Sequence, residues 1–251
     1  MIARTNRLSV ALLYLYYKLY IIYVNTSNNV RKEKSLMYNY VLFDLDGTLT
    51  QSEFGILNSV AFALEKLGIK VDNKESLKKF IGPPLAASFR DFFGMDEENI
   101  EKAIGYYREC YNGGEIFNAP LYDGIEETLK TLFDNGVKMF VVTSKPAHMA
   151  KKIIEHFDIS KYFEDVVGPD LKDRSYSKKE LVEAAINKTT DTPNLKDYVM
   201  IGDRCFDIEG AVGNNIDSIG VLYGYGNKEE FEEAGATYII EKPKNILEIV
   251  L

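Results

Sequence analysis

The sequence is poor in cysteine, which excludes the classes of protein that depend on it. Among 251 residues only Cys110 and Cys205 are cysteines, and they lie far apart in unlike contexts. They lack the close spacing of a cysteine metal motif. Two ordinary thiols are typical of a protein that works in a reducing compartment, so we expect a cytoplasmic location.

The main part of the chain also lacks an excess of positive charge. Residues 37–251 hold 24 of the 30 basic residues and 37 of the 38 acidic ones, which gives them a net charge of −13. A surface this acidic repels nucleic acids and anionic membranes, so we expect neither as a partner. A phosphate ligand would have to be held by a few local cations and a metal ion.

A long hydrophobic run is missing as well. Residues 9–24 are apolar apart from Ser9 and Lys18 and follow two arginines, which is the outline of a signal or anchor segment. The run is shorter than the ~20 apolar residues that span a bilayer, and no small-residue cleavage site follows it. We expect residues 1–36 to be a leader that is disordered or absent from the native protein, with Met37 as the start. A membrane anchor is the alternative.

What the sequence does contain is a regular alternation of buried strands and amphipathic helices. Continuous apolar runs at Tyr40–Phe43, Lys138–Val142 and 198–201 each lead into polar residues, as buried strands of a parallel sheet do. Further strands are predicted at 218–222 and 237–240, and helices at 124–133, 147–157, 178–187 and 208–213. This order predicts an α/β fold with a doubly wound parallel sheet.

Residues 53–118 interrupt the alternation, because they contain only helical patterns. These patterns lie at 54–67, 74–80, 85–93 and 97–111, with glycine or proline between them. Ligands of open α/β sheets bind beyond the carboxyl ends of the strands. An insertion that leaves the end of the first strand is therefore placed to cover the site. We predict an α/β catalytic core of residues 37–52 and 119–251, with residues 53–118 as a helical cap.

Four aspartates follow two of the predicted strands. Asp44 and Asp46 are two residues apart after the first strand, and Asp203 and Asp207 follow the strand at 198–201. Turn formation or helix capping would explain one or two of these acids. Four at one edge of a sheet favour a Mg²⁺ site instead, since this ion takes carboxylate and phosphate oxygens as ligands. The carboxylates outnumber what one ion needs, which leaves one as a nucleophile and one as an acid and base.

Hydroxyl groups and a lysine are the candidates for binding phosphate. Thr143 and Ser144 end the second strand just before a predicted helix, where hydroxyl and backbone N–H groups suit a phosphate oxygen. N-capping of that helix by Ser144 is the alternative. Lys178, which begins a helix, is our choice for the positive charge on the phosphoryl group. Its rivals by position are Lys145, Lys172 and Lys179.

At these residues the sequence resembles the haloacid dehalogenase-like phosphatases. The most specific element is Asp44-Leu45-Asp46-Gly47-Thr48 after an apolar strand. Thr143 matches the second motif of that family, Lys178 the basic third motif, and the segment from Asp203 to Asp207 the acidic fourth motif. One departure is that the family's lysine often precedes a proline, whereas Lys178 does not.

The resemblance implies roles for these residues. Asp44 would be the nucleophile and Asp46 the general acid and base. Asp203 would bind Mg²⁺ together with Asp44 and the backbone carbonyl of Asp46, with Asp207 on the metal or next to its ligands. The segments LYDGIEETLKTLFDNG, FVVTSKP and NNIDSIGVLYGYG are similar to the branch with phosphoglycolate phosphatases and bacterial 5'-nucleotidases, which has a small helical cap.

Three other functions share this fold. A dehalogenase does not need the proton donor that Asp46 provides. A phosphomutase like β-phosphoglucomutase needs the same core residues and is the first alternative. A non-catalytic phospholigand-binding module would be expected to have lost one of the motif residues, all of which are present. We therefore expect an enzyme that hydrolyses a small phosphate ester, and the sequence gives no indication of its oligomeric state.

The charge balance and position of the leader generate a prediction. A protein that begins at Met37 should be folded and as active as the full chain, because Met37 precedes the first strand by only a few residues. Thermal melting and specific activity of the two proteins make the comparison. A melting temperature many degrees lower in the shorter protein would show that residues 1–36 stabilise the fold.

Overall fold

The structure, a computed structural model, describes residues 37–81, 85–170, 176–189 and 192–251. The expected leader and its alternative, a membrane anchor, fall in residues 1–36 and so lie outside the described residues. Within the described ranges, no helix is long and apolar enough to cross a membrane.

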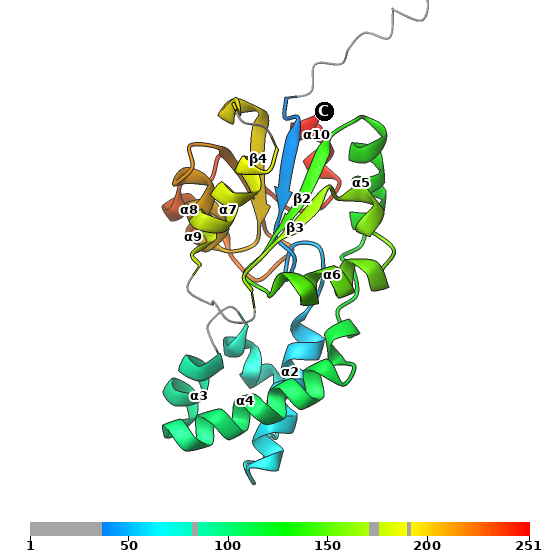
Figure 1. The fold of residues 1–251 in the computed structure, drawn as a ribbon. Helices are drawn as coiled ribbons and strands as arrows, with labels where there is room; N and C mark the ends of the chain where they lie inside the picture. The colour runs from blue at the N-terminus through cyan, green and yellow to red at the C-terminus, as the bar shows by residue number, and fades with distance from the viewer. Residues whose placement is uncertain (1–36, 82–84, 171–175, 190–191) are drawn as a thin grey trace, which may run out of the picture. The chain divides into compact units, whose positions relative to one another are not determined.

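The centre of the fold is a six-stranded parallel sheet with strand order β3-β2-β1-β4-β5-β6 (Figure 1). Its strands are β1 (Tyr40–Phe43), β2 (Lys138–Val142), β3 (Asp165–Val167), β4 (Tyr198–Gly202), β5 (Asp217–Val221) and β6 (Tyr238–Ile240). The direction of the strand order reverses at β1, from which the chain winds outward on both sides. The predicted fold class, a doubly wound parallel sheet, is confirmed.

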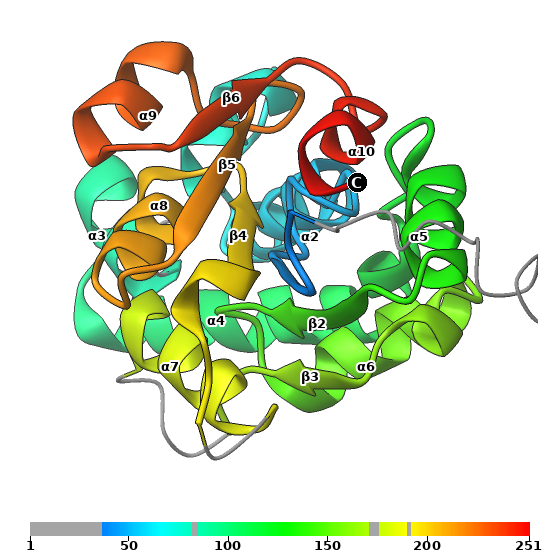
Figure 2. The ribbon, with the colours of Figure 1, turned by 90° about the horizontal axis from the view of Figure 1, so that it is seen from above.

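Helices cover both faces of this sheet, which explains why its strands are continuously apolar. Figure 2 shows α7 (Lys178–Asn187), α8 (Cys205–Val212) and α9 (Lys228–Ala234) along one side of the sheet. It shows α5 (Ile125–Asp134), α6 (Ala147–His156) and α10 (Asn245–Val250) along the other. Val41, Leu42 and Phe43 of β1 are therefore fully buried.

Among the described residues of 53–118, the regular elements are all helices. They are α2 (Glu53–Lys66), the 3₁₀ helix η1 (Lys74–Phe80), α3 (Leu85–Phe93), α4 (Glu97–Asn112) and the short 3₁₀ helix η2 (Glu115–Phe117). These helices have an apolar core of their own, in which the rings of Phe80 and Phe89 pack edge to face 5.0 Å apart. We call residues 53–118 the helical insertion, and its action as a cap stays a proposal.

Several elements differ from those the sequence predicts. The helical pattern predicted at 74–80 is confirmed, and the helix there is a 3₁₀ helix. Strand β3, helix α9 and helix α10 are absent from the prediction, because each is short and α9 buries only Phe231. Helix α8 begins at residue 205 rather than 208, since the Asp207 carboxylate accepts a hydrogen bond from Arg204 N (3.1 Å) and so caps the first turn.

The register of the sheet determines where the polar residues meet. Phe43 at the end of β1 lies opposite Val141 of β2 on one side and Ile201 of β4 on the other. The residues that follow these strands therefore leave the sheet at the same edge. Asp44 is one of them, and its backbone N donates to Ile201 O at 2.8 Å, which continues the ladder by one residue.

Candidate active site

The turn after β1 directs two carboxylates away from the core. Leu45 is fully buried, and its carbonyl oxygen accepts hydrogen bonds from the backbone N of Leu49 (2.9 Å) and Thr50 (3.0 Å). This tight turn packs Leu45 inward while Asp44 and Asp46 on either side of it face the carboxyl edge of the sheet. Asp44 is buried, and 24% of the Asp46 side chain is exposed.

Gly47 allows this turn to lie against the next carboxylate. Its φ is +89°, a backbone conformation that residues other than glycine rarely adopt. A Cβ atom at this position would lie 2.1 Å from Asp203 Oδ2 and 2.7 Å from the ring of Tyr225. A side chain at position 47 would therefore displace Asp203 or Tyr225.

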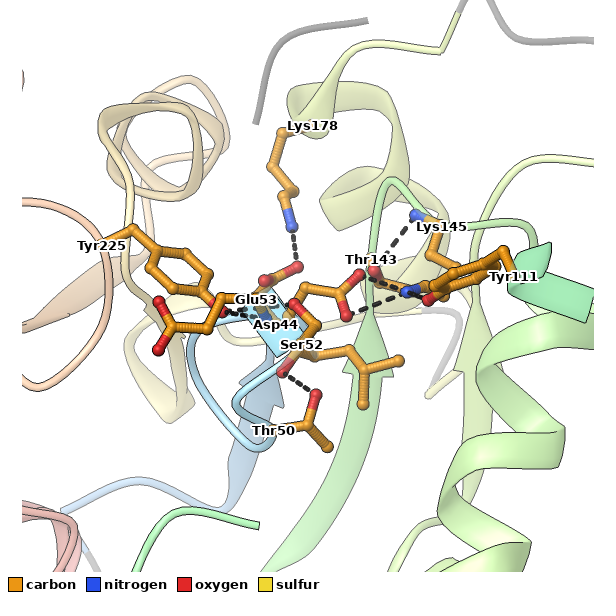
Figure 3. A network of polar contacts seen from close by, with 11 residues as sticks. Asp44, Thr50, Ser52, Glu53, Tyr111, Thr143, Lys145, Lys178 and Tyr225 are labelled. Carbon is orange, nitrogen blue, oxygen red and sulfur yellow. Dashed lines mark hydrogen bonds and ion pairs between the residues drawn. The ribbon is translucent and has the colours of Figure 1, made fainter. Parts of the chain in front are cut away.

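Three buried carboxylates converge beyond β1 and β4. Asp44, Asp203 and Asp207 each have a carboxylate oxygen within 4.8 Å of the other two. Lys178 enters between them from α7, with its Nζ 2.6 Å from Asp44 Oδ1 and 2.7 Å from Asp207 Oδ1, and it donates to Val142 O at 2.9 Å. Figure 3 shows Lys178 pointing at Asp44. The sequence-predicted lysine thus reaches the acidic residues.

The charges in this group do not balance. The cluster holds three carboxylates and one ammonium group, which contacts two of them. Burial raises the pKa of Asp44 to about 7 although Lys178 acts to lower it. Burial, reinforced by the charges of Asp44 and Asp207, raises the pKa of Asp203 well above its usual range. A cation between the three carboxylates would relieve both effects.

An unsatisfied atom gives a second reason to expect a cation. Asp207 Oδ1 is buried, and no hydrogen-bond donor of the described residues reaches it with suitable geometry. Lys178 Nζ is its ion-pair partner at 2.7 Å. Oxygen ligands and an uncompensated negative charge are what Mg²⁺ requires, so the three residues fit this ion. The Asp46 carboxylate lies outside this triad.

Asp46 pairs instead with Lys145 of the segment after β2. Lys145 Nζ lies 2.7 Å from Asp46 Oδ2 and 2.9 Å from Oδ1, and only 8% of the lysine side chain is exposed. The same ammonium group donates to the hydroxyl oxygen of Tyr111 at 2.7 Å. Because Tyr111 belongs to α4, this contact links the helical insertion to the carboxyl edge of the sheet (Figure 3).

Thr143 and Ser144 lie where the sequence predicts, at the end of β2. Thr143 is buried and its Oγ1 accepts a hydrogen bond from Lys145 N at 3.1 Å. Ser144 is exposed. The alternative that Ser144 caps α6 is wrong, because Pro146 occupies the N-cap position and no side-chain hydrogen bond caps this helix.

The sequence prediction missed the loop after β5. Tyr225 donates a backbone hydrogen bond to Asp203 Oδ2 (2.9 Å), and its hydroxyl accepts from Glu53 N (3.0 Å) at the start of α2. The hydroxyl also lies 3.3 Å from Ser52 Oγ. Two tyrosines separated by glycine after a buried strand, in the segment LYGYG, were the available signal. The loop connects the acidic triad to the helical insertion.

The rival lysines have other positions. Lys145 forms an ion pair with Asp46, Lys179 is exposed, and Lys172 lies outside the described residues. An open cleft of about 620 Å³ borders the site at Tyr225, between that loop and η1. Its lining includes Lys78, Tyr122 and Arg204 but neither Asp44 nor Asp46. The cleft therefore lies next to the acidic triad, at the loop after β5.

Comparisons with known proteins agree with this geometry. The model of the haloacid dehalogenase-like hydrolase family matches residues 41–221. A 5'-nucleotidase of Pseudomonas aeruginosa is 36% identical over 207 residues, which are 82% of this chain and 93% of that protein. The tyrosine-protein kinase PtkA of Mycobacterium tuberculosis is 34% identical over 199 residues, 79% of this chain and 67% of that one.

Solved structures show the same fold. The crystal structure of a predicted phosphatase from Clostridium acetobutylicum aligns with a TM-score of 0.75 at 44% sequence identity, covering 84% of this chain and 99% of that one. The match to the family model includes the residues of all four motifs, which follow β1, β2 and β4 and begin α7. The chain belongs to the haloacid dehalogenase-like hydrolase family, and it is a phosphatase of that family.

Proposed function

We propose that this protein is a Mg²⁺-dependent phosphomonoester hydrolase that acts through an aspartyl phosphate on Asp44. Its substrate would be a small phosphorylated metabolite, with phosphoglycolate or a 5'-nucleotide as the first candidates, in the cytoplasm. The proposal rests on one observation: the two aspartates after β1 form separate ion pairs with different lysines. Lys178 holds Asp44 at 2.6 Å, and Lys145 holds Asp46 at 2.7 Å. Two carboxylates in unlike surroundings suit two different chemical roles.

Asp44 is suited to attack phosphorus. Its Oδ1 is held by Lys178, which leaves Oδ2 to form the new bond to phosphorus while the bond to the ester oxygen breaks. Burial keeps bulk water away from the carboxylate, so it meets the phosphoryl group with little hydration to lose. Hydrolysis of the acyl phosphate by water then restores Asp44 and releases phosphate.

Asp46 is suited to move protons in both steps. It is more exposed than Asp44 and lies two residues further on, so it would face the ester oxygen of a phosphoryl group bound at Asp44. In the first step it would give a proton to that oxygen, and in the second it would take one from the attacking water. Asp46 can do both because it loses its proton in the first step and is then the carboxylate that accepts a proton in the second.

The remaining residues would hold the phosphoryl group and the metal. Mg²⁺ would be bound by Asp44, Asp203, Asp207 and the backbone carbonyl of Asp46, and when bound it neutralises charge on the transferring group. Lys178 adds a positive charge next to Asp44. Thr143 and the exposed Ser144 would donate to phosphate oxygens from the end of β2, in line with the role of the family's second motif.

Transfer to an acceptor other than water is the alternative. A phosphomutase returns the phosphoryl group to a sugar, and the relative named as a protein kinase suggests a protein acceptor. The two outcomes differ in their product, because only hydrolysis releases inorganic phosphate. A phosphate-release screen over phosphomonoesters with Mg²⁺ therefore decides between them.

The nucleophile can be tested by replacing one atom. Asp44→Asn should reduce phosphate release to background without loss of folding, because the amide keeps the shape but does not attack phosphorus. The matched control is Asp158→Asn, since the Asp158 side chain is 86% exposed and its positive φ suits asparagine. Full activity in folded Asp44→Asn protein would refute the mechanism.

The proton donor can be tested in the same assay. Asp46→Asn should lower kcat by about 10²–10⁴ with a poor leaving group, which is the usual contribution of general acid–base catalysis. The loss should be smaller with p-nitrophenyl phosphate, whose leaving group needs no proton. An equal loss with both substrates would assign Asp46 a different role.

Metal dependence follows from the unbalanced carboxylates. Excess chelator should abolish activity and Mg²⁺ should restore it, whereas Ca²⁺ should bind but restore little, because its looser coordination misplaces the attacking oxygen. Titration of the chelated protein with each ion, followed by thermal melting and phosphate release, separates binding from turnover. Undiminished hydrolysis in excess chelator would contradict the proposed metal site.

A further inference from the structure

Lys145 has an environment that the proposed reaction does not explain. Its ammonium group has three N–H donors, and three acceptor atoms surround it: both oxygens of Asp46, at 2.7 and 2.9 Å, and the hydroxyl of Tyr111 at 2.7 Å. The side chain is 8% exposed. The acidic triad has its own cation in Lys178, so Lys145 serves only the side of the site at Asp46.

Tyr111 is held in place on the opposite side of this contact. It is buried on α4, and its ring stacks on that of Tyr107 one turn earlier, with centroids 5.3 Å apart and planes 15° apart. This stacking fixes the ring, and the hydroxyl then points at Lys145 (Figure 3). The helical insertion thus presents one rigid polar group to the catalytic edge of the sheet.

These two side chains flank the place that the leaving group must occupy. In the proposed function, Asp46 gives a proton to the ester oxygen, so the group attached to that oxygen must come within hydrogen-bond distance of Asp46. Lys145 contacts Asp46, and Tyr111 of the helical insertion contacts Lys145. A leaving group at this position is met by an ammonium group and a phenol hydroxyl.

Electrostatics then favour one class of leaving group. When a leaving group engages Asp46, it displaces Lys145 from one or both carboxylate oxygens, and a buried ammonium without an anion is costly. A neutral leaving group offers no replacement. A carboxylate or a second phosphate close to the ester oxygen does, because it exchanges one anionic partner of Lys145 for another and accepts a hydrogen bond from Tyr111.

We propose that Lys145 and Tyr111 form the leaving-group subsite and select phosphate compounds whose leaving group carries its own anionic group next to the ester oxygen. The proposal rests on the proposed function and narrows its substrate. It favours an α-hydroxy acid phosphate such as 2-phosphoglycolate over a 5'-nucleotide, because a nucleoside leaving group is neutral.

The test compares 2-phosphoglycolate with its amide, phosphoglycolamide, which has nearly the same shape without the negative charge. With Mg²⁺ present, the unaltered protein should have a kcat/KM for the carboxylate roughly tenfold to a hundredfold higher, the size expected for a hydrogen bond to a charged group. Lys145→Met should bring the ratio close to one. Equal use of the two compounds by the unaltered protein, or an unchanged ratio in Lys145→Met, would overturn the proposal.

Two further variants separate the subsite from general damage. Tyr111→Phe removes only the hydroxyl and should lower the same ratio about threefold to tenfold, within the range for one hydrogen bond. Lys151→Met on α6 is the matched control, because Lys151 is 52% exposed and pairs weakly with Asp165 at 3.5 Å. It should leave the ratio unchanged. A similar drop in the Lys151 variant would overturn the assignment.

A binding measurement keeps the subsite distinct from the reaction. In the Asp44→Asn protein, which should not turn over, calorimetry with Mg²⁺ should show tighter binding of 2-phosphoglycolate than of its amide, and adding Lys145→Met should remove the difference. If 2-phosphoglycolate binds more tightly than its amide but the unaltered protein hydrolyses neither, the proposed hydrolase is refuted and the subsite is supported. Hydrolysis without the preference would support the hydrolase and overturn the subsite.

Discussion

The concentration of buried negative charge at one edge of the parallel sheet is the constraint on which the site depends. Asp44, Asp203 and Asp207 are nearly inaccessible to water, and their oxygens lie within 4.8 Å of one another. Such an arrangement is unfavourable in a folded protein unless cations compensate it. The parallel register makes it unavoidable, because β1 and β4 end side by side and each is followed by an aspartate.

The surrounding structure can be understood as the response to this charge. Lys178 reaches the triad from α7, and Gly210 of α8 leaves room for it, since a Cβ atom there would lie 2.9 Å from the lysine Cγ. The loop after β5 adds a backbone N–H at Asp203. One ammonium group does not balance three carboxylates, so the cluster keeps a negative charge that the divalent cation of the proposed chemistry would compensate.

In the proposed mechanism, two lysine–aspartate pairs have different roles. Lys178 with Asp44 lies at the acidic triad, where the phosphoryl group would be transferred, whereas Lys145 with Asp46 faces the helical insertion. The proposed subsite adds Tyr111 to the second pair, so that the insertion contributes to substrate choice and the sheet to chemistry.

The sequence predicted the fold well because buried parallel strands leave a continuous apolar pattern that few other structures produce. It also located Asp44, Asp203 and Asp207 at one edge, since polar residues directly after such strands must meet there. It did not reveal the partners of Asp46. Tyr111 lies four residues after Tyr107, which is the spacing of ordinary helix packing, and Lys145 looks like any lysine near the start of a helix. Only the contact between α4 and the segment after β2 brings them together.

The short elements escaped prediction for a related reason. Strand β3 has three residues, and its place at the edge of the sheet comes from pairing with β2 rather than from its own sequence. Helix α9 is acidic and held by the burial of Phe231. Both depend on contacts distant in the chain, which local patterns do not contain.

The measurement that tests the central claim most directly is the location of the phosphoryl group during turnover. The protein is mixed with Mg²⁺ and a substrate carrying a radioactive phosphoryl group, quenched in acid within one turnover, and cleaved into peptides. The account predicts label on the peptide that contains Asp44, released by hydroxylamine as expected for an acyl phosphate. Label on any other residue, or steady phosphate release with no labelled protein at any time, would contradict it.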